Sequence, residues 1–124
     1  MATRAYTVTQ ITAFGDFRCH VIQWTGLLNG DDGAPIEMSG SADRSAHALG
    51  TFGASGNLKI EGSNDPGATP TNWATLNNPQ GTALDLTGAS IKAVLESTHF
   101  IRPRASAGDG TTNLTCQLFV RRLG

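Results

Sequence analysis

The fold is decided by two stretches, GNLKIEGSNDPGATPTNWATL at residues 56–76 and FIRPRASAGDGTTNLTCQLFVRR at residues 100–122. In both, short runs of alternating apolar and polar residues are separated by clusters of Gly, Pro, Asn and Asp. These clusters favour turns, because Gly and Asn tolerate positive φ and Pro fixes φ near the value that a turn needs. The pattern therefore predicts antiparallel strands joined by turns.

The clearest strand runs from Asn113 to Arg122. Because side chains alternate across a strand, its two faces carry Leu114, Cys116, Leu118 and Val120 on one side and Thr115, Gln117, Phe119 and Arg121 on the other. Asn57–Glu61 predicts a half-buried strand in the same way, with Leu58 and Ile60 inward and Lys59 and Glu61 outward. In Phe100–Arg104, Pro103 lacks the amide donor of a central ladder, which predicts an edge strand or a bulge.

Elsewhere the pattern predicts strands at Arg4–Thr12, where an edge position fits, and at Trp73–Leu76, and a loop over the polar segment Gly40–Ala46. Phe17–Leu28 carries apolar residues on both faces, which predicts a central strand or one with a face covered by a neighbour. Residues 88–96 have apolar positions at helical spacing, so a short helix and an extended crossing segment both fit. We therefore expect an all-β fold, an antiparallel β-sandwich or jelly roll of about eight strands. It forms one domain over residues 1–124, and residues 1–5 are a candidate extended arm.

Composition narrows the classes of function. The 124 residues carry 15% charged side chains, against ~25% in typical domains, and a net charge of −1. Nothing here favours nucleic acid or an anionic membrane as a partner, and no apolar run is long enough to span a bilayer. The N-terminus lacks the apolar core of a signal peptide. We expect a protein made and kept in a cytoplasm until it joins something larger.

No catalytic or metal-binding constellation emerges from the spacing. The two cysteines, Cys19 and Cys116, have no CxxC partner, which favours free buried thiols over a disulfide or a metal site. None of the three histidines stands at ligand spacing from another histidine or a cysteine. The acidic residues Asp31, Asp32 and Asp65 lie among turn residues, where Asp usually caps backbone amides. We predict no enzymatic activity, no cofactor and no metal.

Interface candidates come from arginine and tryptophan. Seven of the nine basic residues are arginine, and Arg102, Arg104, Arg121 and Arg122 fall on the last two predicted strands. Arginine favours bidentate pairing with carboxylates at interfaces, although a solvated face with local ion pairs fits equally. Trp24 is a further interface candidate, while both Trp24 and Trp73 also fit core positions.

Several turn motifs resemble those of a family of small structural proteins of tailed bacteriophages. They read Glu61-Gly62-Ser63-Asn64-Asp65, Asn72-Trp73, Pro79-Gln80-Gly81, Ile101-Arg102-Pro103 and Gly108-Asp109-Gly110-Thr111. The resemblance covers a little over half of the chain. It implies a capsid decoration (cement) protein with a jelly-roll or β-sandwich fold, located on the capsid surface of the virion and assembled in the host cytoplasm.

The implied partners are the major capsid protein and copies of the chain itself, as a dimer or trimer. Many weak contacts would sum through multivalency and hold the shell against the pressure of packaged DNA. The alternative is a tail- or fibre-associated binding module. Ser63-Asn64-Asp65 followed by Asn72-Trp73 is similar to discoidin-like sandwich domains that bind glycans, and Trp73 would then grip the ligand.

Overall fold

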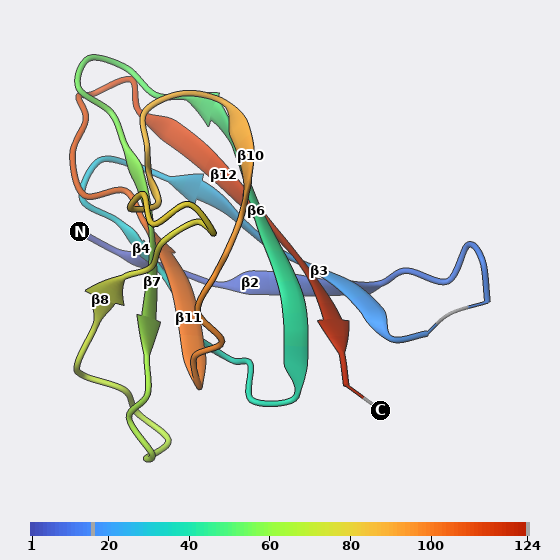
Figure 1. The fold of residues 1–124 in the computed structure, drawn as a ribbon. Coiled ribbons are helices and arrows are strands. Elements are labelled where there is room, and N and C mark those ends of the chain that lie inside the picture. The colour runs from blue at the N-terminus through green and yellow to red at the C-terminus, as the bar shows by residue number, and fades with distance from the viewer. Residues whose placement is uncertain (16, 124) are drawn as a thin grey trace.

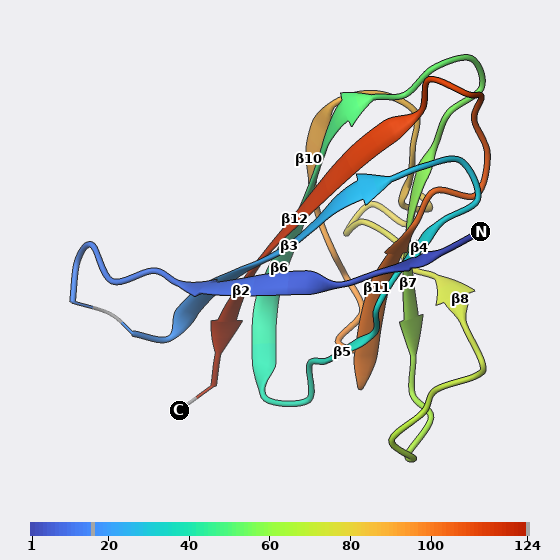
Figure 2. The ribbon, with the colours of Figure 1, turned by 180° about the vertical axis from the view of Figure 1, so that it is seen from behind.

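The chain folds into two β-sheets packed face to face (Figures 1 and 2). The computed structural model describes residues 1–15 and 17–123. Within these ranges it contains strands and no helix, and hence no helix that could cross a membrane. The strands are β1 (Thr3–Arg4), β2 (Tyr6–Gln10), β3 (Cys19–Leu27), β4 (Asp32–Gly33), β5 (Ile36–Glu37), β6 (Ser41–Thr51), β7 (Leu58–Ser63), β8 (Ala74–Thr75), β9 (Asp85–Leu86), β10 (Ser90–Ala93), β11 (Phe100–Arg104) and β12 (Asn113–Arg122).

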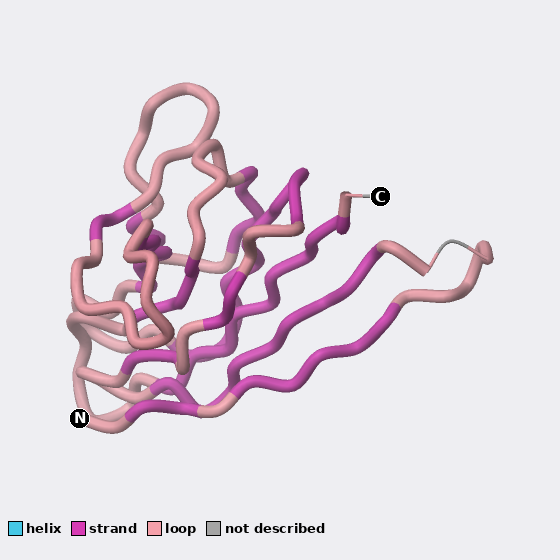
Figure 3. The backbone as a smooth tube through the Cα atoms, turned by 90° about the horizontal axis from the view of Figure 1, so that it is seen from below, coloured by secondary structure: helices cyan, strands magenta, loops and turns pink. Residues whose placement is uncertain are grey.

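The first sheet has five antiparallel strands in the order β10-β6-β12-β3-β2. The predicted strand Asn113–Arg122 is confirmed and lies at its centre, between β6 and β3. The expectation that the Phe17–Leu28 segment holds a central strand is also confirmed, since β3 lies between β12 and β2. β2 forms the outer edge of this sheet (Figure 3).

The second sheet has seven strands, with the order β1-β4-β11-β7-β8 and with β5 and β9 attached to β11 and β7. Its long strands are antiparallel, whereas the short pair β1–β4 is parallel. The N-terminal segment 1–5, a candidate extended arm on sequence, contributes the short strand β1 to this sheet. Thr3 and Arg4 form β1, and Arg4 is ion-paired with Asp31 at 2.8 Å.

One hydrophobic core fills the space between the two sheets. The inward-facing positions of the long strands are almost fully buried, and they include Ile22, Trp24, Leu58, Ile60, Ile101, Leu114, Cys116, Leu118 and Val120. This confirms the predicted inward faces of the Asn113–Arg122 and Asn57–Glu61 segments. Burial raises the pKa of the Cys116 thiol to about 12, so this cysteine behaves as a small hydrophobe.

The prediction of a loop over Gly40–Ala46 was wrong. Ser41–Thr51 is the longest strand of the structure and pairs with both β12 and β10. Its inward side chains near the centre are Arg44, Ala46 and Ala48, all buried. Because two of these are small and one is charged, the segment lacks the large apolar alternation by which a strand is recognised.

The helical alternative for residues 88–96 was also wrong. Ser90–Ala93 form β10, which pairs along the edge of β6. Ile91, one of the residues at helical spacing, is exposed, while Val94 is buried. The backbone amides that a helix would have satisfied internally are instead paired with β6 and with neighbouring loops.

The edge position predicted for Phe100–Arg104 was wrong as well. β11 is an interior strand, with β7 on one side and β4 and β5 on the other. Pro103 is opposite Ile60, whose backbone bonds go to Leu76 and Leu84 and not to Pro103. On the other side, the chain passes from β4 to β5 without pairing with Pro103. The amide N–H that Pro103 lacks would therefore have had no backbone acceptor in either neighbouring strand, and the proline is tolerated inside the sheet.

Candidate assembly surface

The predicted interface residue Arg102 lies on the outer face of the seven-stranded sheet. Its Nε donates to Glu61 Oε1 at 2.9 Å, and its Nη1 is 3.2 Å from Asp32 Oδ2. The guanidinium also lies over the Trp73 ring, 4.1 Å from the ring centroid. Arg102 is therefore engaged inside its own chain by two carboxylates and an aromatic ring.

Arg104 belongs to the same charged group but is more accessible. Its Nη1 is 3.7 Å from Glu61 Oε2, and close to half of the side chain is exposed. Glu61, predicted to point outward, does so but is buried beneath its neighbours. We call the outer side of the seven-stranded sheet the charged face, defined by Asp32, Lys59, Glu61, Arg102 and Arg104.

Trp73 lies at the border of the charged face and is partly buried. Because Arg102 covers one face of its ring, that face is already occupied within the chain. The glycan-binding alternative needs an open ring to grip a sugar.

The other arginine candidates lie at the end of β12. Arg121 is ion-paired with Asp43 at 3.3 Å in an exposed position, and such pairs contribute little to stability. Arg122 is exposed and borders a groove that Val8, Met38 and Val120 also line.

Trp24 has to be removed from the interface candidates, because only 1% of its surface is exposed. Its indole N–H donates to the Ala34 carbonyl at 3.0 Å, and its ring meets Tyr6 edge-on. Gly33 packs so closely that a Cβ there would lie 2.6 Å from the Trp24 ring and from Pro103. Trp24 is therefore a core anchor whose neighbour must be glycine.

The outer side of the five-stranded sheet is different, because it carries no charged side chain along its centre. We call it the neutral face. It consists of Thr7, Thr9, Cys19, Val21, Gln23, Thr25, Ser45, His47, Leu49, Ile91, Ala93, Thr115, Gln117 and Phe119. A shallow hollow of about 140 Å³ lies on it between Val21, Ile91 and Phe119. The Arg121–Asp43 pair stands at its rim.

A projecting loop extends the neutral face beyond the sandwich. Residues 11–18 connect β2 to β3, and we call this loop the arm; Asp16 in it lies outside the described residues. Figures 1 and 3 show it reaching well past both sheets. Phe14 is 100% exposed and Phe17 60% exposed, and Ile11 is also accessible. Exposed aromatic residues gathered on one protrusion are typical of a surface that meets a partner.

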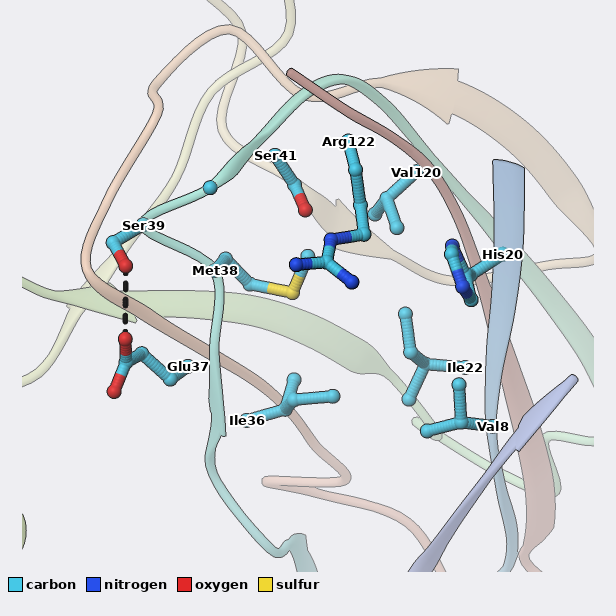
Figure 4. A pocket seen from close by; sticks show the side chains of 11 residues that line it. Val8, His20, Ile22, Ile36, Glu37, Met38, Ser39, Ser41, Val120 and Arg122 are labelled. Carbon is cyan, nitrogen blue, oxygen red and sulfur yellow. Dashed lines mark hydrogen bonds between the residues drawn. The ribbon is translucent and has the colours of Figure 1, made fainter. Parts of the chain in front are cut away.

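A groove of about 380 Å³ lies at the base of the arm, where the seven-stranded sheet no longer covers the five-stranded one. Its floor is apolar and comes from both sheets, with Val8, Ile22, Ile36, Met38 and Val120 (Figure 4). Polar side chains, His20, Glu37 and Arg122, stand around it. The groove thus joins the edge strand β2 to the end of β12.

The metal-ligating residue types do not cluster in residues 1–15 and 17–123. No three His, Cys, Asp or Glu side chains gather there to hold a metal ion, and both cysteines are free thiols. Two of the three acidic turn residues, Asp31 and Asp65, accept backbone amides as predicted, whereas Asp32 binds the side chains of Thr3 and Arg102. Asp65 accepts the amides of Thr71 and Asn72, and Asp31 accepts those of Leu28 and Ala2.

Reasoning from the sequence missed the arm as a surface feature, whereas the edge position that fitted the Arg4–Thr12 segment is the one that β2 occupies. The available signal was Phe14 and Phe17 flanking a Gly-Asp turn, since aromatic residues in a turn have no strand face through which to reach the core. We also compared the chain with known proteins. Neither the protein-family models nor the curated proteins contain a match.

Proposed function

We propose that the chain is a non-enzymatic structural protein of a virion, a capsid decoration protein that binds the outer surface of a tailed-phage head. The observation that carries the proposal is the arm, which holds Phe14 and Phe17 in solvent on a hairpin anchored in the sheet. In the isolated chain the Phe14 side chain is fully exposed and that of Phe17 is 60% exposed, and the loop that carries them reaches past both sheets (Figure 3).

The energetics suit a partner that covers the arm. Full burial of one Phe side chain is worth about 1.5–3 kcal/mol, so two rings supply a useful but weak contact once the cost of association is subtracted. A shell presents many equivalent sites, and weak contacts repeated over them add up to firm attachment. A low-charge surface also avoids the desolvation cost that buried charges would impose at such contacts.

The turn motifs support the phage assignment through their resemblance to small structural proteins of tailed phages. In this chain Glu61–Asp65 closes β7 and Ile101–Pro103 lies inside β11, so the motifs frame the charged face. The proposed partners are the major capsid protein and further copies of the chain. The proposed location is the capsid surface, reached after synthesis in the host cytoplasm.

Binding to expanded capsids tests the proposal. The purified chain is mixed with expanded heads that lack it and sedimented, and we expect saturation at a fixed copy number and a higher capsid melting temperature. Phe14→Ser with Phe17→Ser should abolish co-sedimentation. Leu95→Ser removes an exposed apolar side chain far along the sequence and should leave it unchanged. Absence of the chain from purified virions by mass spectrometry would contradict the proposal.

A further inference from the structure

The edges of the two sheets are unequally protected against pairing with another strand. An exposed edge presents free N–H and C=O groups, and proteins usually blunt it with a charge, a proline, a bulge or a short strand. The edge strands β1 and β8 have two residues each, and β10 has four with Lys92 among them. β2 has five residues, Tyr-Thr-Val-Thr-Gln, with no charge, no proline and no register shift against β3.

The hydrogen bonds of the hairpin determine which groups of β2 face outward. Ile11 N–H donates to Cys19 O at 2.9 Å, so this pair belongs to the hydrogen-bonded class of the ladder. Because bonded and non-bonded pairs alternate in an antiparallel ladder, Thr9 and Thr7 also bond to β3. The backbone groups of Tyr6, Val8 and Gln10 then point to the free edge, where no other segment of the described chain lies (Figure 3).

We propose that β2 pairs with β2 of a second copy of this chain, antiparallel, around a two-fold axis at Val8. In this register Val8 is opposite Val8, and Tyr6 is opposite Gln10, in the two copies. Tyr6, Val8 and Gln10 are the residues of β2 whose backbone N–H and C=O groups face outward. Their pairing therefore forms about six hydrogen bonds between the two copies without disturbing the β2–β3 ladder. An isologous contact of this kind closes after two subunits.

Side chains favour a copy of the same strand as the occupant. Pairing at Val8 sets Thr7 opposite Thr9 and Val8 opposite Val8, which are favourable cross-strand neighbours. Arg4, the charged residue nearest to β2, faces Thr12 of the other copy, so no like charges meet. The two five-stranded sheets become one sheet of about ten strands, a size that open sheets tolerate.

The pairing also covers apolar surface. Val8 is 51% exposed in the single chain and borders the groove with Ile22 and Val120. Opposite residues of an antiparallel pair lie on the same face of the sheet, so the two Val8 side chains meet there. The grooves of the two copies then adjoin across the axis. The neutral faces join as well, on the other side of the sheet.

The mass of the purified chain in solution tests this inference. Light scattering after size exclusion should give twice the 13.0 kDa of the single chain. Val8→Lys places two ammonium groups opposite each other at the axis and should convert the dimer to monomer. Thr9→Lys adds the same charge one residue away, on the neutral face and opposite Thr7, and should leave the dimer intact. A wild-type monomer, or a dimer that survives Val8→Lys, would overturn the inference.

Cross-linking gives an independent readout if Val8→Lys fails to fold. In a Cys19→Ser background, Val8→Cys should form a disulfide-linked dimer on oxidation, because opposite Cα atoms of a bonded pair are about 5.5 Å apart. Gln10→Cys is the control, since its two copies would be four residues out of register, about 14 Å apart. Equal cross-linking at both positions would contradict the two-fold at Val8. Because these experiments use the isolated chain, they can fail while capsid binding holds, and the reverse.

Discussion

The outer faces of the two sheets differ in charge: one carries ion-paired side chains, and the other has no charged side chain along its centre. On the charged face, Arg102 lies between Asp32 and Glu61 and over Trp73, so its Nε and Nη1 have carboxylate partners within the chain. On the neutral face no carboxylate or ammonium group stands along the centre, and Gln117 and Gln23 bond to each other at 2.8 Å. The central arginine of the charged face is thus paired within its own chain, whereas the neutral face is uncharged along its centre and ends at β2, an edge strand of its sheet.

The difference shows that arginine on a strand does not by itself mark an interface. A guanidinium with two carboxylates within 3.2 Å would have to lose these partners before it could bind a new one. Covering an uncharged face costs less in desolvation than covering a charged one, provided that its hydroxyl and amide groups find hydrogen-bond partners. The predictions below test this contrast, ordered by the expected change in the free energy of unfolding.

The largest loss of stability is expected from substituting Arg44, a charged residue of the five-stranded sheet whose side chain points into the protein. Arg44 is 4% exposed, and its Nη2 donates to the carbonyls of Met38 and Thr98 at 2.9 and 3.0 Å. Burial lowers its pKa. Arg44→Met leaves these carbonyls unpaired and should cost about 3 kcal/mol in urea unfolding. Arg121→Met, on the exposed end of β12, should cost less than about 0.5 kcal/mol; equal losses would contradict a structural role for Arg44.

On the charged face, Arg102→Met should cost about 2 kcal/mol, because it leaves the buried Glu61 with Arg104 as its remaining partner. Chemical denaturation measures the loss. Adding Glu61→Met to the variant should restore part of the stability, since the uncompensated carboxylate is then gone. A double variant less stable than the sum of the two single changes would show that the pair is not the source of the effect.

A smaller, pH-dependent effect is expected from the turn carboxylates, which belong to neither face. The Asn72 side-chain amide and the Thr71 and Asn72 amides lower the pKa of Asp65 to about 2. The amide of Ala54 and the Thr111 hydroxyl lower that of Asp109 to about 2. Because both values lie below the ordinary 3.8, their stabilisation is complete above about pH 4 and is lost as pH falls towards 2.

Thermal unfolding between about pH 5 and pH 2 measures this loss. The double variant Asp65→Asn, Asp109→Asn should show a shallower fall in melting temperature with acidification than the wild type. A fall of equal slope in both proteins would place the acid sensitivity elsewhere in the chain.

The smallest effect on folding is expected in the arm. Phe14→Ser should change the free energy of unfolding by less than about 0.5 kcal/mol, since the fully exposed ring contributes little to the folded chain. The same change should weaken binding to expanded capsids. A clear loss of stability would show that the ring packs against its own chain and would remove the arm from the assembly surface.

The strands that could be read from the sequence are those with large apolar residues at alternate positions. β12 and β7 satisfy this, with Leu114, Leu118, Leu58 and Ile60 inward. β6 does not, because Ala46 and Arg44 occupy inward positions where the sheets approach closely or where backbone carbonyls need a donor. Both requirements arise only when the two sheets pack together, so the local sequence pattern cannot predict them.

The candidate site was predicted less well than the fold. Arg102, Arg104 and Trp24 were chosen for their residue types. Arg102 is ion-paired with Asp32 and Glu61, and Trp24 is buried. Whether an arginine is free depends on which carboxylates the folded sheet brings beside it. Asp32 and Glu61 approach Arg102 from positions far away in the sequence, which spacing cannot show.

By itself, the sequence determined the all-β character, the principal core residues and the turns, because alternation and turn chemistry are local properties of the chain. The tertiary structure alone decided that β11 tolerates Pro103 in the interior of a sheet and that Ser90–Ala93 is a strand. It also decided which sheet face is charged, which edge is open and where the arm projects. These features depend on which strands become neighbours, and that choice is made by packing across the whole molecule.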